Sequence, residues 1–301
     1  MCSLRKILSC TLWNLRLLSK NLRFYLGLAL GFLICFFLTE KTVSLAHLFG
    51  TNIQVVEPFV WCFADSDSVL FASLALLLPL SQIPRLDAPA SYLVFRAGRR
   101  NWILGQAVTT ILVSIFYTVF LLISTCLLTL GRVSLSNEWS DTATVMSFAP
   151  AQFEVALTVV RRTIKQTTPY ACAGSIFLLM AQYMLLLSLL NLAVSLRFGK
   201  RAGMNVVIAV SLLSYLLTPE RFMVWLGIEQ EGLRYIANLC AAWLSPLQQA
   251  TYTMHSFGYD QLPTITQTHL LMGSANVGLL ILCIAAGKRI HFLFRKGEAN
   301  E

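Results

Sequence analysis

The sequence predicts an all-α integral membrane protein with six membrane-spanning helices. Hydrophobic residues make up 56% of the 301 residues and charged residues only 12%, whereas a soluble domain carries about 25% charged residues. Long uncharged stretches recur along the chain, and a charge at the centre of a spanning helix costs roughly 2.5 to 3.5 kcal/mol. We therefore expect residues 1–301 to form a single transmembrane domain.

The predicted spans are the uncharged stretches that approach the length of about 20 residues needed to cross a bilayer. The first two are short for this purpose, and we expect their helices to continue past the uncharged core. Arg23 would then extend its aliphatic stem to the interface. The six spans are 24–39, 68–84, 101–131, 166–196, 202–219 and 261–287.

The charged residues are sorted between the two sides of this arrangement. Most of the 23 Lys and Arg residues lie before the first span, between the second and third, between the fourth and fifth, and after the sixth. Most acidic residues lie in the other connections. Because basic loops are retained in the cytoplasm, both termini are expected there. A basic side attracted to anionic membrane lipid explains the net charge of +9 without a nucleic-acid partner.

The segment 1–23 is predicted to be an amphipathic helix that lies at the membrane interface. It has no apolar core followed by a small-residue cleavage site, so we expect it to be retained. Its basic face carries Arg5, Arg16, Lys20 and Arg23. The apolar face carries Leu4, Ile7, Leu8, Leu12, Leu15, Leu18 and Leu22.

The uncharged segment 235–259 is not expected to be a seventh span. Its apolar part before Pro246 is only about eleven residues, too short to cross, and the proline breaks a helix. We interpret the segment as an outer re-entrant or interfacial hairpin, with Ser245 and Pro246 forming part of an outer gate. Irregular backbone at membrane depth must be buried in protein or line a cavity.

Two other outer features have no clear function in the sequence. The loop 132–165 contains Pro150 and then QFEVALTVVRRTIKQ, which predicts a short helix at the outer interface. Asp65 and Asp67 lie at the outer end of the second span, where they form either a solvated helix entrance or an ion site.

Gly27 and Gly31 form a G-x-x-x-G step in the first span, which serves dimerisation or packing within the chain.

The sequence contains no recognisable catalytic, metal or cofactor motif. The eight cysteines and four histidines are scattered, without the spacings of metal sites. The chain also lacks the glycine-rich loop that binds nucleotide phosphates. We therefore do not expect an enzyme, and any ATP hydrolysis would take place on a separate subunit.

The loop 85–102, with the sequence RLDAPASYLVFRAGRRNW, has a recognisable pattern. It resembles the cytoplasmic loop of permease subunits of bacterial ATP-binding-cassette (ABC) transporters, in the type-two exporter branch. WLSPLQQATYTMHSF resembles the outer re-entrant segment of the same family, and the layout of six spans agrees with it. The matching loop positions are Asp87, Pro89, Tyr92, Arg96, Gly98, Arg99, Arg100 and Trp102.

This resemblance implies a half-transporter in a bacterial plasma membrane. Two permease subunits, identical or different, would bind two ATPase subunits that hold ATP and Mg²⁺. Guanidinium groups at Arg96, Arg99 and Arg100 would contact carboxylates of the ATPase. The alternative is that they only keep the loop cytoplasmic and contact lipid phosphate. Trp102 is expected to anchor the third span at the interface.

Two other functions stay open from the sequence. One is an intramembrane enzyme that uses a buried polar residue such as Gln182 or Asn191. The other is a non-transporting sensor or resistance scaffold with the same fold. The substrate is not predicted, because a largely apolar cavity with amides such as Gln106, Gln182 and Asn276 suits lipids, peptides or drugs.

Overall fold

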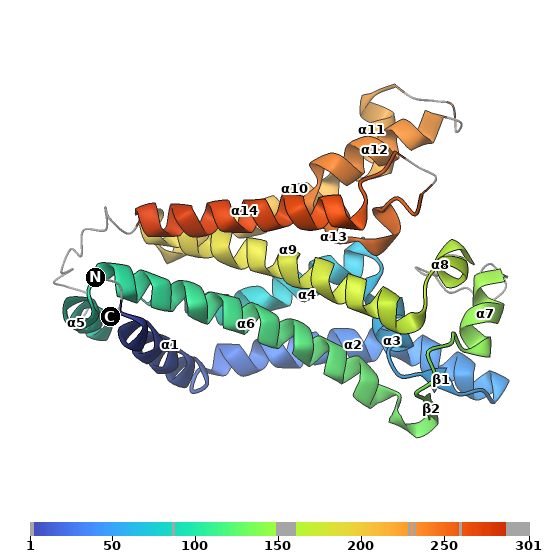
Figure 1. Ribbon diagram of the computed structural model, residues 1–301, viewed down its shortest axis with the longest axis horizontal. Coiled ribbons are helices and arrows are strands. Elements are labelled where there is room, and N and C mark those ends of the chain that lie inside the picture. The colour runs from blue at the N-terminus through green and yellow to red at the C-terminus, as the bar shows by residue number, and fades with distance from the viewer. Residues whose placement is uncertain are drawn as a thin grey trace, which may run out of the picture.

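The computed structural model describes residues 3–85, 88–148, 161–227, 230, 233–258 and 261–286. Over these residues the protein is a bundle of long helices (Figure 1). Four helices are long and apolar enough to cross a membrane: α2 (Leu22–Phe49), α6 (Arg99–Leu128), α9 (Pro169–Phe198) and α14 (Ile265–Ala286). Such a set of helices is compatible with a multi-pass membrane protein.

Two bent helix pairs raise the number of candidate spans to six if each pair counts as one span. Helix α4 (Ser66–Leu80) is preceded by α3 (Glu57–Phe63) at an angle of 89°. Helix α10 (Lys200–Leu216) is followed by α11 (Pro219–Trp225) at 73°. The second and fifth predicted spans therefore correspond to helices of 15 and 17 residues, which are short for a bilayer.

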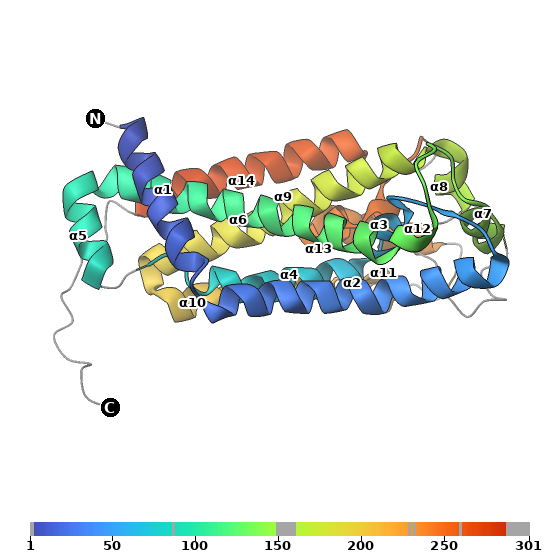
Figure 2. The ribbon, with the colours of Figure 1, turned by 90° about the horizontal axis from the view of Figure 1, so that it is seen from below.

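Successive long helices run in alternating directions, so the connections gather at two ends of the bundle (Figures 1 and 2). We call the end that holds α1 and the first turn of α6 the basic end. We call the opposite end, which holds the connections after α2 and α6, the acidic end. Every Asp and Glu of the described residues belongs to the acidic half, including Glu40 in the last part of α2.

The N-terminal helix α1 (Leu4–Leu18) crosses the bundle at the basic end instead of continuing α2 (Figure 2). It contacts α6 through Cys10, Thr11 and Asn14, which are all buried. The leucines at positions 4, 8 and 12 are exposed. The side of α1 that faces the protein is thus small and polar. The predicted leucine face is not buried as a whole, because Leu18 is buried whereas Leu4, Leu8 and Leu12 are exposed.

The acidic end is closed by short elements, most of which the sequence did not predict. All seven residues of α3 are buried, and the helix contacts α2, α6 and α9. Strand β1 (Ile53–Gln54) pairs in parallel with β2 (Val133–Ser134), which follows the 3₁₀ turn η1 (Leu130–Arg132). The loop 132–165 also contains α7 (Asp141–Phe148) and α8 (Arg161–Gln166). The expected helix start at Pro150 lies outside the described residues.

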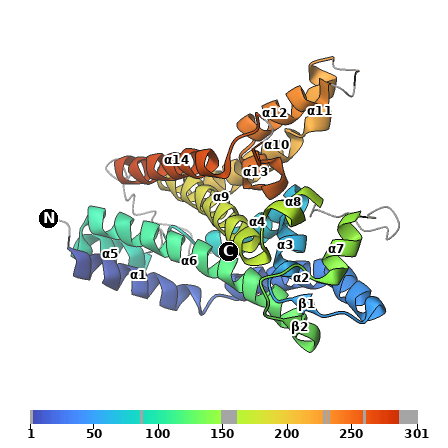
Figure 3. The ribbon, with the colours of Figure 1, turned by 45° about the vertical axis from the view of Figure 1, so that its right-hand side comes forward.

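The segment 235–259 is broken into short helices, as its proline predicts. Helix α12 (Arg234–Leu244) packs beside α11 (Figure 3). It ends at Ser245, and α13 (Pro246–Ala250) and the 3₁₀ turn η4 (Tyr252–Met254) follow. Helix α13 contacts α9, α4 and α10, so the break is held within the bundle.

A polar stripe runs along the buried face of α6. The hydroxyls of Thr110, Ser114 and Thr118 each donate to the carbonyl four residues earlier at 3.0 Å. These bonds satisfy hydroxyl groups that have no water to bind in an apolar interior. Ser114 Oγ also lies 2.8 Å from Ser188 Oγ of α9. Hydrogen bonds of this kind join helices in a membrane.

Gly27 and Gly31 provide close contacts between helices of the same chain. A Cβ atom at Gly27 would lie 2.6 Å from Cδ of Pro79 in α4, and one at Gly31 would lie 2.6 Å from Oη of Tyr117 in α6. The space over both glycines is thus already filled by the chain's own side chains.

Candidate functional site

The predicted coupling residues form a corner at the basic end. Helix α5 (Ala88–Ala97) ends at Gly98, and α6 begins at Arg99. Gly98 has φ = 85°, a conformation that glycine adopts without the strain of a side chain. A similar corner joins α9 to α10 at Gly199, with φ = 93°, before Lys200 and Arg201.

Both corners place two cations in the first turn of a helix. Positive charge at a helix N-terminus opposes the helix dipole and costs roughly 0.3 to 1 kcal/mol. The pairs at positions 99–100 and 200–201 therefore do not serve helix stability. Their positions instead fit a role at the membrane surface or in contact with another molecule.

Helix α5 presents aromatic and basic side chains outward. Tyr92 is 65% exposed and Phe95 is 93% exposed, and Arg96, Arg99 and Arg100 are exposed as well. We call these five residues the α5 surface. Phe95 was not among the predicted site residues, although its place one residue before Arg96 in a short amphipathic helix was the available signal.

Trp102, another predicted member of this group, lies inside the protein instead of on the α5 surface. Only 1% of its side chain is exposed, and it belongs to the main hydrophobic core. The expectation that Trp102 anchors α6 at the interface is therefore wrong. The side chain faces inward because the first turn of α6 is covered by other elements of the basic end, which the sequence did not reveal.

Asn101 connects the three elements that meet here. Its Oδ1 accepts a hydrogen bond from the backbone N–H of Ser3 at 3.1 Å. Its Nδ2 donates to the carbonyl of Ala97 at 2.7 Å. One buried amide in α6 thus holds both the start of α1 and the end of α5. The α5 surface is positioned on this framework.

A groove of about 510 Å³ lies between α1 and α5. It is lined by the cations Arg5, Lys6 and Arg96, by two serines, and by Cys10, Trp13, Leu93 and Ala97. Burial raises the pKa of the Cys10 thiol, so this sulfur stays protonated at neutral pH and is a poor nucleophile. The groove therefore offers positive charge and apolar surface, without a reactive thiolate.

Of the two predicted outer-gate residues, Ser245 lies in the interior and Pro246 is half-buried. Ser245 is fully buried, and its Oγ donates to the carbonyl of Ser214 in α10 at 2.8 Å. The same oxygen accepts from the backbone N–H of Gln248 at 3.3 Å and so caps α13. Pro246 occupies the first position of α13, where its missing N–H costs no hydrogen bond. Together the two residues fix the joint between α12 and α13.

Glu57 connects two helices at the acidic end. Its side chain is buried, and its two carboxylate oxygens accept from the backbone N–H of Ser140 at 2.6 Å and from Ser140 Oγ at 2.7 Å. The Ser140 hydroxyl oxygen also accepts from the N–H of Ala143 in α7. Glu57 thus joins the buried helix α3 to the start of α7.

The amides proposed to line a substrate cavity are engaged between helices. Gln106 Nε2 donates to Asn14 Oδ1 at 3.3 Å. Gln182 Oε1 lies 2.9 Å from His269 Nδ1. The backbone carbonyl of Gln182 accepts a hydrogen bond from Asn276 Nδ2 at 3.2 Å. These contacts join α6 to α1, and α9 to α14.

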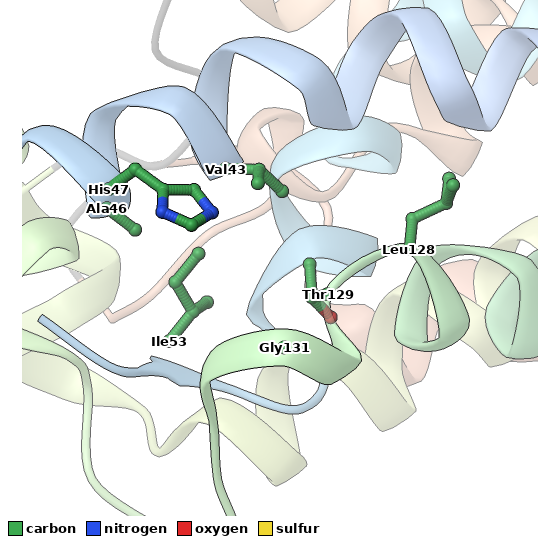
Figure 4. Close-up of a pocket in the computed structure, with 7 residues that line it drawn as sticks. All are labelled: Val43, Ala46, His47, Ile53, Leu128, Thr129 and Gly131. Carbon is green, nitrogen blue, oxygen red and sulfur yellow. The ribbon is translucent and has the colours of Figure 1, made fainter.

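A smaller pocket at the acidic end has a volume of about 150 Å³ (Figure 4). Among the lining residues that Figure 4 draws, only His47 has a titratable side chain, and the others are mostly apolar. No group of three His, Cys, Asp or Glu residues within the described ranges is placed to hold a metal ion.

Comparison with known proteins gives no further assignment, because no family model, no curated protein and no solved structure matches this chain.

Proposed function

We propose that this chain is the membrane-spanning subunit of an ATP-driven exporter in a bacterial plasma membrane. The observation that supports this most is the α5 surface, an exposed aromatic and basic patch at the basic end of an apolar bundle. In this proposal the basic end faces the cytoplasm, and separate ATPase subunits bind ATP and Mg²⁺ there.

The chemistry of the α5 surface suits a protein partner. Exposed aromatic and arginine side chains are enriched at the centres of protein interfaces. Phe95 would enter a pocket on the ATPase, while the neighbouring guanidinium groups would form paired hydrogen bonds with carboxylates. The described residues of the basic end include no acidic side chain, and a partner rich in carboxylates would complement this positive charge.

A second permease subunit is part of the proposal, and it is either a copy of this chain or a different chain. Gly27 and Gly31 are not its contact sites here, because Pro79 and Tyr117 already occupy the space above them. Ser245 and Pro246 would serve as the outer gate by holding α13 among α4, α9 and α10.

The intramembrane-enzyme alternative is less well supported. Gln182 contacts His269, and Asn191 Nδ2 donates to the carbonyls of Leu80 and Ile83 at 3.2 Å. Both polar residues thus have structural partners. A sensor or scaffold would use the same α5 surface, and transport of a substrate in reconstituted vesicles separates it from an exporter.

The deciding experiment is purification of the chain from its native host in mild detergent, with mass spectrometry of the proteins that accompany it. We expect a stoichiometric ATPase that is lost in the double variant Arg99→Glu, Arg100→Glu. The matched control is Arg16→Glu, Lys20→Glu, which reverses two cations at the same end but away from α5. A well-folded chain that carries no ATPase would contradict the proposal.

A further inference from the structure

We propose that the groove between α1 and α5 binds the phosphate headgroup of an anionic glycerophospholipid. Both walls of the groove carry cations, because Arg5 and Lys6 line it from α1 and Arg96 lines it from α5. Ser3 and Ser9 add two hydroxyl groups. Its volume of about 510 Å³ falls within the roughly 300 to 1,000 Å³ that is common for ligand sites.

The charge of the groove calls for an anion. No Asp or Glu of the described residues lies at the basic end, so Arg5, Lys6 and Arg96 repel one another without compensation from a carboxylate in this part of the chain. A phosphodiester can accept hydrogen bonds from guanidinium and ammonium groups together. Its binding would therefore relieve this repulsion.

The apolar lining points to a lipid instead of a small soluble anion. Trp13, Leu93 and Ala97 line the groove beside the cations, and a free phosphate ion would gain nothing from them. The glycerol backbone and first methylene groups of a phospholipid would bury this surface. Indole side chains also favour the boundary between headgroups and acyl chains.

The position of α1 places the groove at headgroup level. Leu4, Leu8 and Leu12 form an exposed stripe at i, i+4 spacing, which would lie in the acyl region of the bilayer. Successive residues are 100° apart around a helix, so Arg5 and Ser9 directly flank this stripe. Helix α5 lies farther out at the basic end than α1 (Figures 1 and 2). The groove thus opens between the leucine stripe and α5.

This site overlaps the proposed ATPase contact at one residue. Arg96 belongs to both surfaces, but Arg5 and Lys6 are not part of the α5 surface. A variant of these two residues tests the lipid site alone. Loss of lipid binding with ATPase binding retained would separate the two proposals, as would the reverse result.

The test is native mass spectrometry of the full chain in detergent, titrated with dioleoyl phosphatidylglycerol or dioleoyl phosphatidylcholine. We expect the protein to prefer the anionic lipid, and Arg5→Gln with Lys6→Gln to weaken its binding by about tenfold or more. The matched control Arg16→Gln, Lys20→Gln removes two cations from the same segment but outside the groove. Its binding should change less than about twofold.

Several results would overturn the proposal. Equal loss in both double variants would indicate general attraction of anionic lipid to a basic surface. Equal binding of the two lipids would exclude recognition of the headgroup charge. Complete displacement of the lipid by millimolar inorganic phosphate would indicate a site for a soluble anion. Lipid binding that persists in Arg5→Gln, Lys6→Gln would place the lipid elsewhere.

A second measurement on the unaltered groove covers the case in which the double variant does not fold. Phosphatidylglycerol with brominated acyl chains should quench the fluorescence of Trp13, which lines the groove. The quenching should fall in Trp13→Phe and stay unchanged in Trp225→Phe, which removes an exposed indole at the acidic end. No difference between these two variants would contradict binding in the groove.

Discussion

The backbone N–H of Ser3 donates to Oδ1 of Asn101 across 98 residues of sequence, at 3.1 Å. Asn101 is 5% exposed and also donates to Ala97. This amide links the start of α1 to the end of α5 and so contributes to the shape of the groove, together with the contacts of Thr11 and Asn14 with α6. Leucine cannot replace it, since both bonds need a planar group that donates and accepts.

We expect Asn101→Ala to loosen the basic end without unfolding the bundle. The substitution leaves a buried N–H and a carbonyl without their partners, which costs about 1 to 3 kcal/mol for each group. Hydrogen exchange should therefore accelerate in the first turns of α1. Asn137→Ala is the control, because it removes an exposed amide contact with Tyr170 at the acidic end. Unchanged exchange in α1 would show that Asn101 does not hold it.

We expect Gly31→Ala to destabilise the contact between α2 and α6. The added methyl group would lie 2.6 Å from Tyr117 Oη, and overpacking of this kind costs about 1 to 3 kcal/mol. Tyr117→Phe should restore much of the loss, because it removes the clashing oxygen. That oxygen has no hydrogen-bond partner within the described residues.

The control for this glycine is Gly273→Ala in α14, where nothing lies within 4 Å of the added atom. Thermal unfolding in detergent should show a lower Tm for Gly31→Ala alone. If the double variant with Tyr117→Phe is no more stable than Gly31→Ala, the clash is not with Tyr117.

Phe95→Ala should weaken binding of the proposed ATPase partner by about tenfold or more and leave the stability of the chain unchanged. The reason is that 93% of the side chain is exposed, so its removal takes away no internal packing. Leu135→Ala, at a 75% exposed site near the acidic end, is the matched control. Co-purification yields and Tm values of the three proteins check the prediction, and equal yields would remove Phe95 from the contact.

Glu57→Ala should disturb the acidic end more than Ser140→Ala. The first change removes both bonds between the carboxylate and Ser140, whereas the second leaves the backbone N–H donating to Glu57 at 2.6 Å. A hydrogen bond contributes about 0.5 to 1.5 kcal/mol between neutral groups and about 1.5 to 3 kcal/mol when one partner is ionised. Hydrogen exchange of α7 measures the difference, and equal effects of the two changes would show that the hydroxyl alone carries the connection.

Because His255 is buried, we expect the folded protein to be less stable in mild acid. Burial lowers the pKa of its imidazole from the ordinary 6.5, so the folded protein binds fewer protons than the unfolded chain. Stability is therefore complete above about pH 6.5 and decreases as the pH falls toward the folded pKa. The neutral ring fits its contacts, with Nδ1 at 3.0 Å from the Thr251 carbonyl and Nε2 at 3.0 Å from Thr268 Oγ1.

Thermal unfolding between about pH 5 and 8 tests this prediction. The decrease of Tm below pH 6.5 should be smaller in His255→Gln than in the unaltered chain. His47→Gln, which changes an exposed histidine, should leave the decrease as it is. If the loss of Tm survives in His255→Gln, another group is responsible.

The long helices were predictable because each depends on local composition. The uncharged stretches 24–39, 101–131, 166–196 and 261–287 coincide with α2, α6, α9 and α14, since apolar runs without charge favour helices that cross a membrane. The break after α12 was predictable for a similar reason, because Pro246 cannot continue a helix. The predicted boundaries of the long helices were less accurate, since α2 continues past Glu40 to Phe49.

The buried helix α3 escaped sequence reasoning. Glu57, Pro58 and Trp61 in seven residues do not form a pattern that predicts burial. They are covered because α2, α6 and α9 surround them, and the buried carboxyl group accepts hydrogen bonds from Ser140, far along the chain. The position of Trp102 was predicted wrongly because a tryptophan side chain suits both a membrane interface and a protein core, and the local sequence does not distinguish them.

The sequence by itself therefore determined the class of protein, the separation of basic from acidic connections, the amphipathic N-terminal helix and the position of the helix break. These features follow from composition and from spacing within one helix, which short-range physics controls. Only the tertiary structure decided which faces meet: the glycines against Pro79 and Tyr117, the amide of Asn101 between α1 and α5, and the basic groove beside it. Such contacts join residues that are distant in sequence, and no local pattern specifies their partners.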